Sequence, residues 1–330
     1  MSSSEKTERV MAVLEGRRPD RMPVSFWHHF DAHQWFGPPA VEAHLDLLAA
    51  YDLDFLKVMN DNGYPGPGPI RTVKDLDALT VLNGDEPEFA RQLELIEALA
   101  GQLSGRVLMA TTIFNAWATL RHLVKTTKQH PSPPRLKGTE EQPDRLLTEF
   151  LAEDRQAVAR AVEVVGESLA RFAARCLEAG ADGIFLSVRD DWVDTEANGP
   201  GSYDQIVRGS DLRILEAAAG GRFNLLHVCG CAVNFDAFAQ YPVQAINWAD
   251  RSAGPSIAEV TDRVKPAVCG GVDNLELLPN GTPEQCADQV RDAVAQAGSR
   301  PLLIGPGCTF DPRRVPPQNL QAVCQAARTT

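Results

Sequence analysis

The chain alternates short apolar runs with longer amphipathic stretches over almost its whole length. The apolar runs are bounded by glycine, proline or polar residues, as buried parallel strands are. The runs predicted to be strands are residues 22–26, 55–59, 106–111, 183–188, 224–229, 245–248, 267–271 and 301–304. The helical patterns between them include residues 88–103, 149–179, 211–219, 256–264 and 283–297.

This alternation over 330 residues predicts a single (β/α)8 TIM barrel that spans residues 1–330 as one domain. We expect a helical extension before the first strand. Thr282 followed by Pro283 is typical of a helix start, with proline at the first helical position. An open doubly wound sheet is the alternative, but no GxGxxG motif follows a strand and no Walker A sequence occurs.

One connection is unusually long. Residues 112–145 follow the third predicted strand and carry three prolines close together. The connection lies on the face where barrel enzymes keep their active sites, so a lid over the site is one interpretation. A tolerated surface insertion is the other.

Composition and charge narrow the class of protein. The chain has 32 Lys and Arg against 44 Asp and Glu, a net charge of −12, and no basic stripe, so we expect no nucleic-acid partner. Its apolar runs are shorter than the roughly 18 residues that span a bilayer, and its start is polar, which predicts a cytoplasmic protein without a membrane partner. Seven cysteines without an export signal indicate reduced thiols.

The strongest chemical signal is the sequence LLHVCGC at residues 225–231. Residues two apart on a strand point to the same face, so His227 and Cys229 project together near the carboxyl end of the fifth strand. Cys308 follows the eighth strand in IGPGCTFDP, where a glycine-rich turn could tip it over the barrel mouth. One imidazole and two thiolates leave a fourth position open, which is typical of a catalytic zinc site.

Alternatives to this zinc site stay open, because H-x-C is a short pattern. A cysteine on a barrel strand is usually a small buried apolar residue, and a nearby histidine can simply be hydrogen-bonded. Cys231 shares the parity of Cys229, and Cys269 lies in the seventh strand; each is a core residue or a spare ligand. The cysteines in helical patterns are expected to be structural: Cys176, Cys286 and Cys324.

Further residues near the carboxyl ends of the strands are weaker candidates. Asp250, after the sixth strand, is expected to be catalytic, as a displaceable fourth ligand or as the acceptor for His227; its alternative is a helix N-cap. The residues expected to bind substrate are His28, His29, Asp61 and Trp248. Their alternatives are solvent-exposed histidines, a turn-forming aspartate and ordinary aromatic packing.

Five blocks of sequence, in order, resemble the uroporphyrinogen decarboxylase superfamily. They are ERVMAVLEGRRPDRMPV (8–24), AGADGIFLS (179–187), LLHVCG (225–230), CGGVDNLELLPNGTPEQC (269–286) and LLIGPGCTFDPRRVPPQNLQAV (302–323). This superfamily contains decarboxylases and zinc-dependent methyltransferases that alkylate thiols, including the methylcobamide:coenzyme M type. The resemblance implies a (β/α)8 barrel, in agreement with the strand pattern.

The two branches of the superfamily differ after the first strand. The decarboxylases carry an arginine-rich stretch there that grips substrate carboxylates, whereas residues 25–35 (SFWHHFDAHQW) hold no arginine. The thiol-alkylating branch has H-x-C-G after strand five and a cysteine in a P-G-C turn after strand eight, which His227, Cys229 and Cys308 match. Asp61 stands where decarboxylases place a substrate-binding aspartate.

The resemblance therefore implies a zinc-dependent methyl- or alkyltransferase that activates a substrate thiol as a zinc-bound thiolate. Its partners would be a small-molecule thiol and a methyl or alkyl donor. No D-x-H-x-x-G cobalamin motif occurs, so a corrinoid donor would come from a separate corrinoid protein or as a free cofactor. The alternatives are a metal-free decarboxylase or lyase on the same barrel and a binding protein without turnover. A monomer and a homodimer both remain compatible with the sequence.

Overall fold

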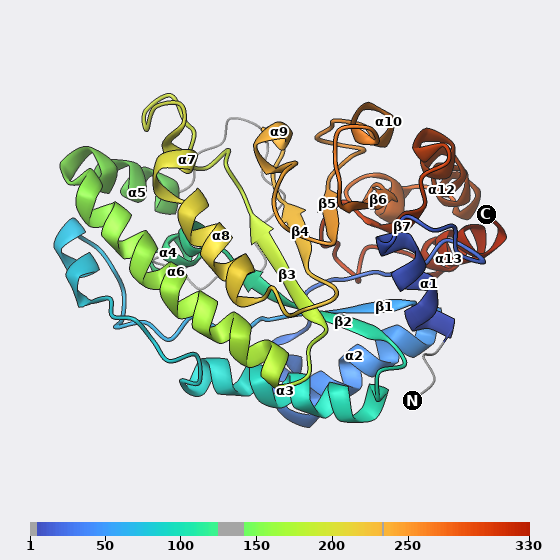
Figure 1. The fold of residues 1–330 in the computed structure, drawn as a ribbon, viewed down its shortest axis with the longest axis horizontal. Coiled ribbons are helices and arrows are strands. Elements are labelled where there is room, and N and C mark those ends of the chain that lie inside the picture. Colours follow the sequence, from blue (N-terminus) through green and yellow to red (C-terminus); the bar gives the residue numbers. More distant parts are fainter. Residues whose placement is uncertain (1–4, 125–141, 233) are drawn as a thin grey trace.

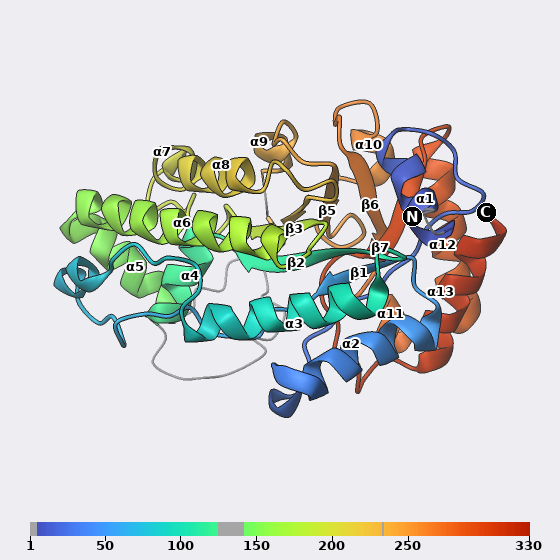
Figure 2. The same cartoon turned by 60° about the horizontal axis from the view of Figure 1, so that its bottom comes forward.

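A computed structural model of the protein describes residues 5–124, 142–232 and 234–330. Within them, parallel strands form one curled sheet in chain order, with helices outside it (Figures 1 and 2). The strands are β1 (Phe55–Val58), β2 (Leu108–Phe114), β3 (Gly183–Val188), β4 (Leu225–Val228), β5 (Ala245–Trp248), β6 (Ala267–Val272) and β7 (Leu302–Pro306). The chain is therefore an α/β protein with a TIM-barrel-like sheet.

The helices cover the outer face of this sheet and one of its ends. The α-helices are α1 (Glu5–Leu14), α2 (Gly37–Tyr51), α3 (Pro87–Leu103), α4 (Ala116–Leu123), α5 (Gln142–Glu153), α6 (Arg155–Glu178), α7 (Ser202–Ile206), α8 (Arg208–Ala217), α9 (Phe235–Phe238), α10 (Ile257–Val260), α11 (Leu277–Asn280), α12 (Pro283–Ala297) and α13 (Pro317–Thr329). The 3-10 helices are η1 (Ala32–Gln34) and η2 (Val73–Ala78). No helix in the described ranges is both long and apolar enough to cross a membrane.

The first predicted strand, residues 22–26, is reduced to a single β-bridge between Val24 and Ile304 of β7. On one side Ser25 N donates to Ile304 O at 3.0 Å, and on the other Asp54 N donates to Val24 O at 2.9 Å. This short segment thus lies between β7 and β1, in the place of an eighth strand. The other predicted strands are confirmed, with ends that differ by at most three residues.

Helix boundaries follow the capping residues. The helix predicted at Pro283 is confirmed, and the Thr282 side chain accepts a hydrogen bond from Gln285 N at 3.2 Å. The single helix predicted over residues 149–179 is instead two, α5 and α6, because Asp154 adopts an extended conformation and caps α6. Its carboxylate accepts from Ala157 N at 2.9 Å, which starts a new helix at that point.

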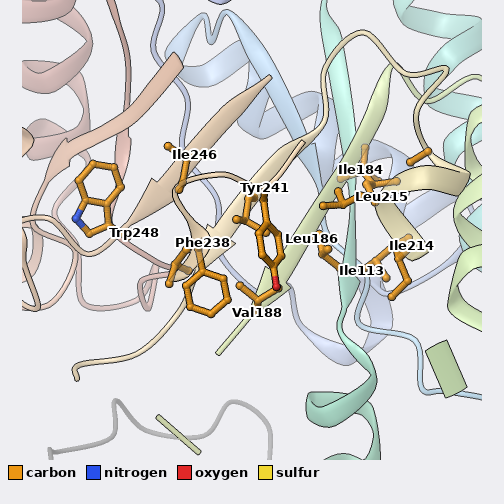
Figure 3. Packing of buried hydrophobic residues seen from close by; sticks show 14 of the residues in the cluster. Ile113, Ile184, Leu186, Val188, Ile214, Leu215, Phe238, Tyr241, Ile246 and Trp248 are labelled. Carbon is orange, nitrogen blue, oxygen red and sulfur yellow. The ribbon is translucent and has the colours of Figure 1, made fainter. Parts of the chain in front are cut away.

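Strand alternation separates two sets of buried side chains. The set that fills the barrel lumen comprises Trp27, Phe55, Met59, Leu108, Ala110, Phe185, Phe223, Leu225, Ala245, Ala267, Cys269 and Leu303. The other set packs between the sheet and the helices, where residues such as Ile113 and Leu186 meet Ile214 and Leu215 of α8 (Figure 3). The lumen is therefore a packed core that supports whatever lies at the carboxyl ends of the strands.

Helix α1 closes the opposite, amino-terminal end of the barrel. Val10 and Val13 belong to the lumen cluster. The buried carboxylate of Asp54 accepts from Arg9 and from Arg21, each at 2.7 Å. A second carboxylate, that of Asp20, also accepts from Arg9 at 2.7 Å. These ion pairs tie α1 to the start of β1.

The long connection after β2 is only partly described. Strand β2 extends to Phe114, α4 follows it, and α5 begins at Gln142. Residues 125–141, the middle of the predicted lid, lie outside the described residues, so the lid stays a prediction.

Candidate metal centre

Strand β4 and the turn after β7 bring three potential ligands together. His227 lies in β4, Cys229 follows it directly, and Cys308 follows β7. Their ligand atoms, a ring nitrogen and two sulfurs, all lie within 4.8 Å of one another. Tetrahedral zinc with bonds of about 2.0–2.3 Å holds its ligands roughly 3.5 Å apart, so donor set and spacing both fit a zinc ion. His227 is buried and the cysteines are half-buried, which leaves one side of the cluster open.

A neighbouring amide orients the histidine. Asn247 pairs with His227 in the register of β4 and β5, and its Oδ1 lies 2.6 Å from His227 Nδ1. The Asn247 Nδ2 group donates to the backbone oxygens of Cys269 and Pro306, at 3.0 and 3.1 Å. Because both amide protons are used, Oδ1 must be the acceptor and His227 Nδ1 the donor. The lone pair of Nε2 is then free to bind a metal.

Two glycines allow the turn that carries Cys308. A Cβ atom at Gly305 would lie 2.9 Å from the Trp27 ring, and one at Gly307 would lie 2.7 Å from Ala249 Cα. Neither position has room for a side chain. The backbone therefore passes close to the lumen and delivers Cys308 next to Cys229.

The two cysteines share a hydrogen bond. This bond lowers the pKa of Cys308 well below that of an ordinary thiol, and the neighbouring His227 and Lys57 act in the same direction. The same hydrogen bond raises the pKa of Cys229. Cys308 is thus held ready as a thiolate, the form in which cysteine binds metals.

Sequence analysis missed Lys57, which projects from β1 into the lumen. Its side chain is 7% exposed, and its Nζ lies 4.1 Å from the centre of the Phe185 ring and 5.7 Å from that of Trp27. Burial lowers the pKa of Lys57 to about 8, while the charges of Cys308, Asp61 and Cys229 act to raise it. The signal in the sequence was a single charge inside the apolar run FLKVM.

The loops after Val24 and after β1 meet beside this lysine. His29 Nδ1 and Asp61 Oδ1 lie 2.5 Å apart, and Phe30 N donates to the same carboxylate at 3.4 Å. His28 Nδ1 donates to His29 O at 2.9 Å, and burial lowers the pKa of His28. The structure therefore brings together His28, His29 and Asp61, three of the residues expected to bind substrate.

Asp250 lies outside the ligand cluster. Its carboxylate accepts from Gly271 N at 2.9 Å and lies 3.2 Å from Arg251 Nε. Burial raises the pKa of Asp250 to about 6. Asn247 accepts the hydrogen bond from His227. The sequence analysis had given that role to Asp250 as one alternative. Through its hydrogen bond with Gly271 N, the aspartate links the loop after β5 to β6.

Trp248 is also placed differently from its prediction. It follows Asn247 in β5 and so points to the opposite face, into the layer between the sheet and the helices (Figure 3). Its ring packs against Phe235 with centroids 4.6 Å apart, and its Nε1 donates to Pro255 O at 2.7 Å. It is therefore a core residue and does not line the lumen.

The remaining cysteines do not join the cluster. All seven cysteines are free thiols. Cys231 is half-buried in the turn after Cys229, and Cys269 is a lumen residue whose burial raises its pKa. The three predicted to be structural are buried in helices: Cys176, Cys286 and Cys324.

The fold and the cluster together define a TIM-barrel-like protein with a candidate metal centre at the carboxyl ends of its strands. The family model described as uroporphyrinogen decarboxylase (URO-D) matches residues 56–330, so the chain belongs to this family. No curated protein sequence is significantly similar to the chain.

A comparison with solved structures supports the fold. A methyltransferase from Methanosarcina mazei is similar over 99% of both chains, with 16% identity and a TM-score of 0.73. A B12-independent methionine synthase from a Shewanella species, in complex with selenomethionine, is similar over 72% of this chain and 66% of its own, with 16% identity and a TM-score of 0.43. At these identities the first similarity establishes the fold alone.

Proposed function

We propose that the protein is a zinc-dependent thiol methyl- or alkyltransferase. The observation that carries the proposal is the cluster of His227, Cys229 and Cys308, whose ligand atoms lie within 4.8 Å of one another at the open end of the barrel. Two sulfurs and one imidazole leave one tetrahedral position for a substrate. The similar protein from Methanosarcina mazei is a methyltransferase, which favours the same class of reaction.

The residues of the chain have distinct tasks in this reaction. Zinc bound there would supply the positive charge that stabilises a substrate thiol in its deprotonated form. Asn247 fixes the orientation of His227, and the turn at Gly305 and Gly307 positions Cys308. Two cysteine thiolates and a neutral imidazole would offset the charge of a bound Zn²⁺, so the deprotonated sulfur of the substrate would keep its electron density. It could then form a bond to the alkyl carbon of the donor, while the bond between that carbon and the donor breaks and the donor keeps its electron pair.

The substrate region extends toward the loops that carry His28, His29 and Asp61. The paired His29 and Asp61 can hold a polar group of the thiol or of the alkyl donor. We propose that a small molecule, or a corrinoid supplied in trans by a separate protein, presents the methyl or alkyl group from this side. Asp250 lies outside the ligand cluster, where its carboxylate accepts from Gly271 N, so the proposal gives it no role in the reaction.

Metal analysis and X-ray absorption of the purified protein test this proposal. We expect close to one zinc per chain, and one additional sulfur neighbour at about 2.3 Å when a substrate thiol is added. Cys308→Ala is expected to lose the metal, whereas the control Cys231→Ala keeps it. Cys229→Ser is expected to lose most of the activity even where some metal remains.

Two results would contradict the proposal. One is full zinc occupancy in Cys308→Ala. The other is a spectrum that does not change with any of a broad set of thiols. Formation of coproporphyrinogen from uroporphyrinogen above background would favour the metal-free decarboxylase instead, against the absence of arginine in residues 25–35.

A further inference from the structure

Lys57 is a buried charge without a hydrogen-bond acceptor among the described residues. Its side chain is 7% exposed, and the contacts of its ammonium are the faces of Phe185 and Trp27. Aromatic faces attract a cation, but they replace only part of its lost hydration. A buried charge of this kind destabilises the fold unless other charges compensate it. Its presence in the lumen therefore needs an explanation beyond packing.

The electrostatic partners of Lys57 are the groups around the candidate metal centre. The Phe185 ring lies between them: Lys57 Nζ is 4.1 Å from its centre, and the centre of the His227 ring is 5.4 Å from the same point. Cys308, Asp61 and Cys229 all act on the ammonium. Asp61 Oδ1 lies 2.5 Å from His29 Nδ1, so this carboxylate interacts with His29 as well as with Lys57. The two sulfurs of the centre are the remaining negative partners.

The formal charge of the centre shows when the lysine matters. Zn²⁺ with two thiolates and a neutral imidazole sums to zero. An anion that takes the open position leaves the centre with one negative charge in a half-buried site. A nearby ammonium restores neutrality. Its attraction to the negative centre is stronger than in water, because the effective dielectric constant inside a protein is lower.

We propose that Lys57 compensates the charge of an anionic ligand that enters the open position of the metal centre. The inference rests on the proposed function in its use of the metal, but it applies to any anionic ligand and not only to a thiolate. Lys57 acts through the field of its ammonium on the bound anion.

Binding of small ligands to the cobalt-loaded, full-length protein tests this assignment. The probes are azide, which is anionic, imidazole, which is neutral, and 2-mercaptoethanol, which binds as a thiolate. Each changes the visible spectrum of cobalt(II) on entering its coordination sphere. The variants are Lys57→Met, which keeps the length of the side chain, and the control Lys74→Met, which removes an exposed charge of η2.

We expect Lys57→Met to weaken the binding of azide and of 2-mercaptoethanol by about tenfold, or about 1.4 kcal/mol. The affinity for imidazole is expected to stay unchanged. Lys74→Met is expected to match the wild type with every probe. Thermal unfolding separates this effect from damage to the fold. Lys57→Met is expected to unfold at a temperature close to that of the wild type, because an apolar side chain of similar length replaces a charge in the apolar lumen.

Several outcomes overturn the assignment. Equal affinities of wild type and Lys57→Met for azide would do so, as would an equal loss for azide and imidazole. A loss seen only with 3-mercaptopropionate, and not with 2-mercaptoethanol or azide, would mean that Lys57 binds an acidic tail instead. A wild-type centre that binds azide with the expected dependence on Lys57 but takes up no thiol would refute the proposed function and leave this inference standing.

Discussion

At the scale of single residues, the orientation of one amide decides the chemistry of the centre. Asn247 donates both of its amide protons to backbone oxygens of β6 and β7, so its side-chain oxygen accepts from His227. A histidine that is free to choose its tautomer would present a protonated nitrogen to the metal part of the time. The hydrogen bond to Asn247 excludes that tautomer. The amide is itself held by β6 and β7, and the turn to Cys308 follows β7.

The first prediction concerns this amide. Asn247→Ala is expected to weaken zinc binding by about 10- to 100-fold, because His227 loses the group that fixes its tautomer and ring. Asn247→Asp keeps an acceptor for Nδ1 and should retain more of the affinity, while losing both donations to the backbone. Competition with a chromophoric chelator measures the two affinities. Equal affinity of Asn247→Ala and the wild type would show that the amide is not needed.

The sequence predicts the ligands better than their surroundings. His227 and Cys229 follow from strand parity, and Cys308 from its place after the last strand. The same parity separates Trp248 from Asn247, so the tryptophan could have been assigned to the helix layer. Lys57 and Asn247 were missed because a polar residue in a short apolar run does not show which neighbours it meets.

At the scale of elements, a buried carboxylate joins four parts of the chain. Asp211 of α8 accepts from Tyr203 of α7, from Tyr241 after α9, and from Asn115, which caps α4. Burial raises the pKa of Asp211 to about 7, and the three donors only partly oppose this shift. These helices therefore meet at a group that changes charge near neutral pH.

The second prediction follows from this pKa. An unfolded aspartate ionises near pH 3.9, about three units below folded Asp211, so the native state binds more protons between these values. The free energy of unfolding should therefore fall as the pH rises from about 4 to 7, and level off above that. Asp211→Asn removes this contribution, so wild type should lose stability relative to the variant between pH 5 and pH 8. Urea unfolding of both proteins measures it, and a pH-independent difference would contradict it.

The third prediction concerns the ion pairs of Asp54 with Arg9 and Arg21 at the amino-terminal end of the barrel. Asp54→Ala leaves Arg9, itself 6% exposed, without its buried partner, and loses the acceptor for Arg21 and Val24 N. Removal of one partner of a buried pair costs about 3–5 kcal/mol of unfolding free energy. The control Asp20→Ala removes the more exposed partner of Arg9, for which about 1 kcal/mol or less is expected. Urea denaturation of both variants distinguishes the two losses.

Element boundaries were predictable where local residues set them. Thr282 and Pro283 mark the start of α12, and the structure agrees. Residues 22–26 were predicted to be a full strand, but their hydrogen bonds depend on β7, far away in the chain. The break between α5 and α6 at Asp154 was missed because the apolar period continues through it.

At the scale of the whole molecule, the core and the centre are separate. The lumen and the helix layer are filled by apolar side chains that do not depend on a metal. The fourth prediction is that a chelator removes bound zinc without unfolding the chain. Far-UV circular dichroism should stay native-like and thermal unfolding cooperative, with a lower midpoint because bound metal stabilises by mass action. A random-coil spectrum after chelation would contradict this.

The place of Cys308 in the chain has a consequence for biosynthesis. Two candidate ligands, His227 and Cys229, lie in β4 and directly after it, whereas the third, Cys308, follows β7 and precedes α13. A nascent chain that has emerged as far as β6 therefore holds two of the three candidate ligands, His227 and Cys229. The three candidate ligands come together only when β7 docks between β6 and the Val24 segment. On the proposed function, metal loading would therefore report that β7 has joined the sheet.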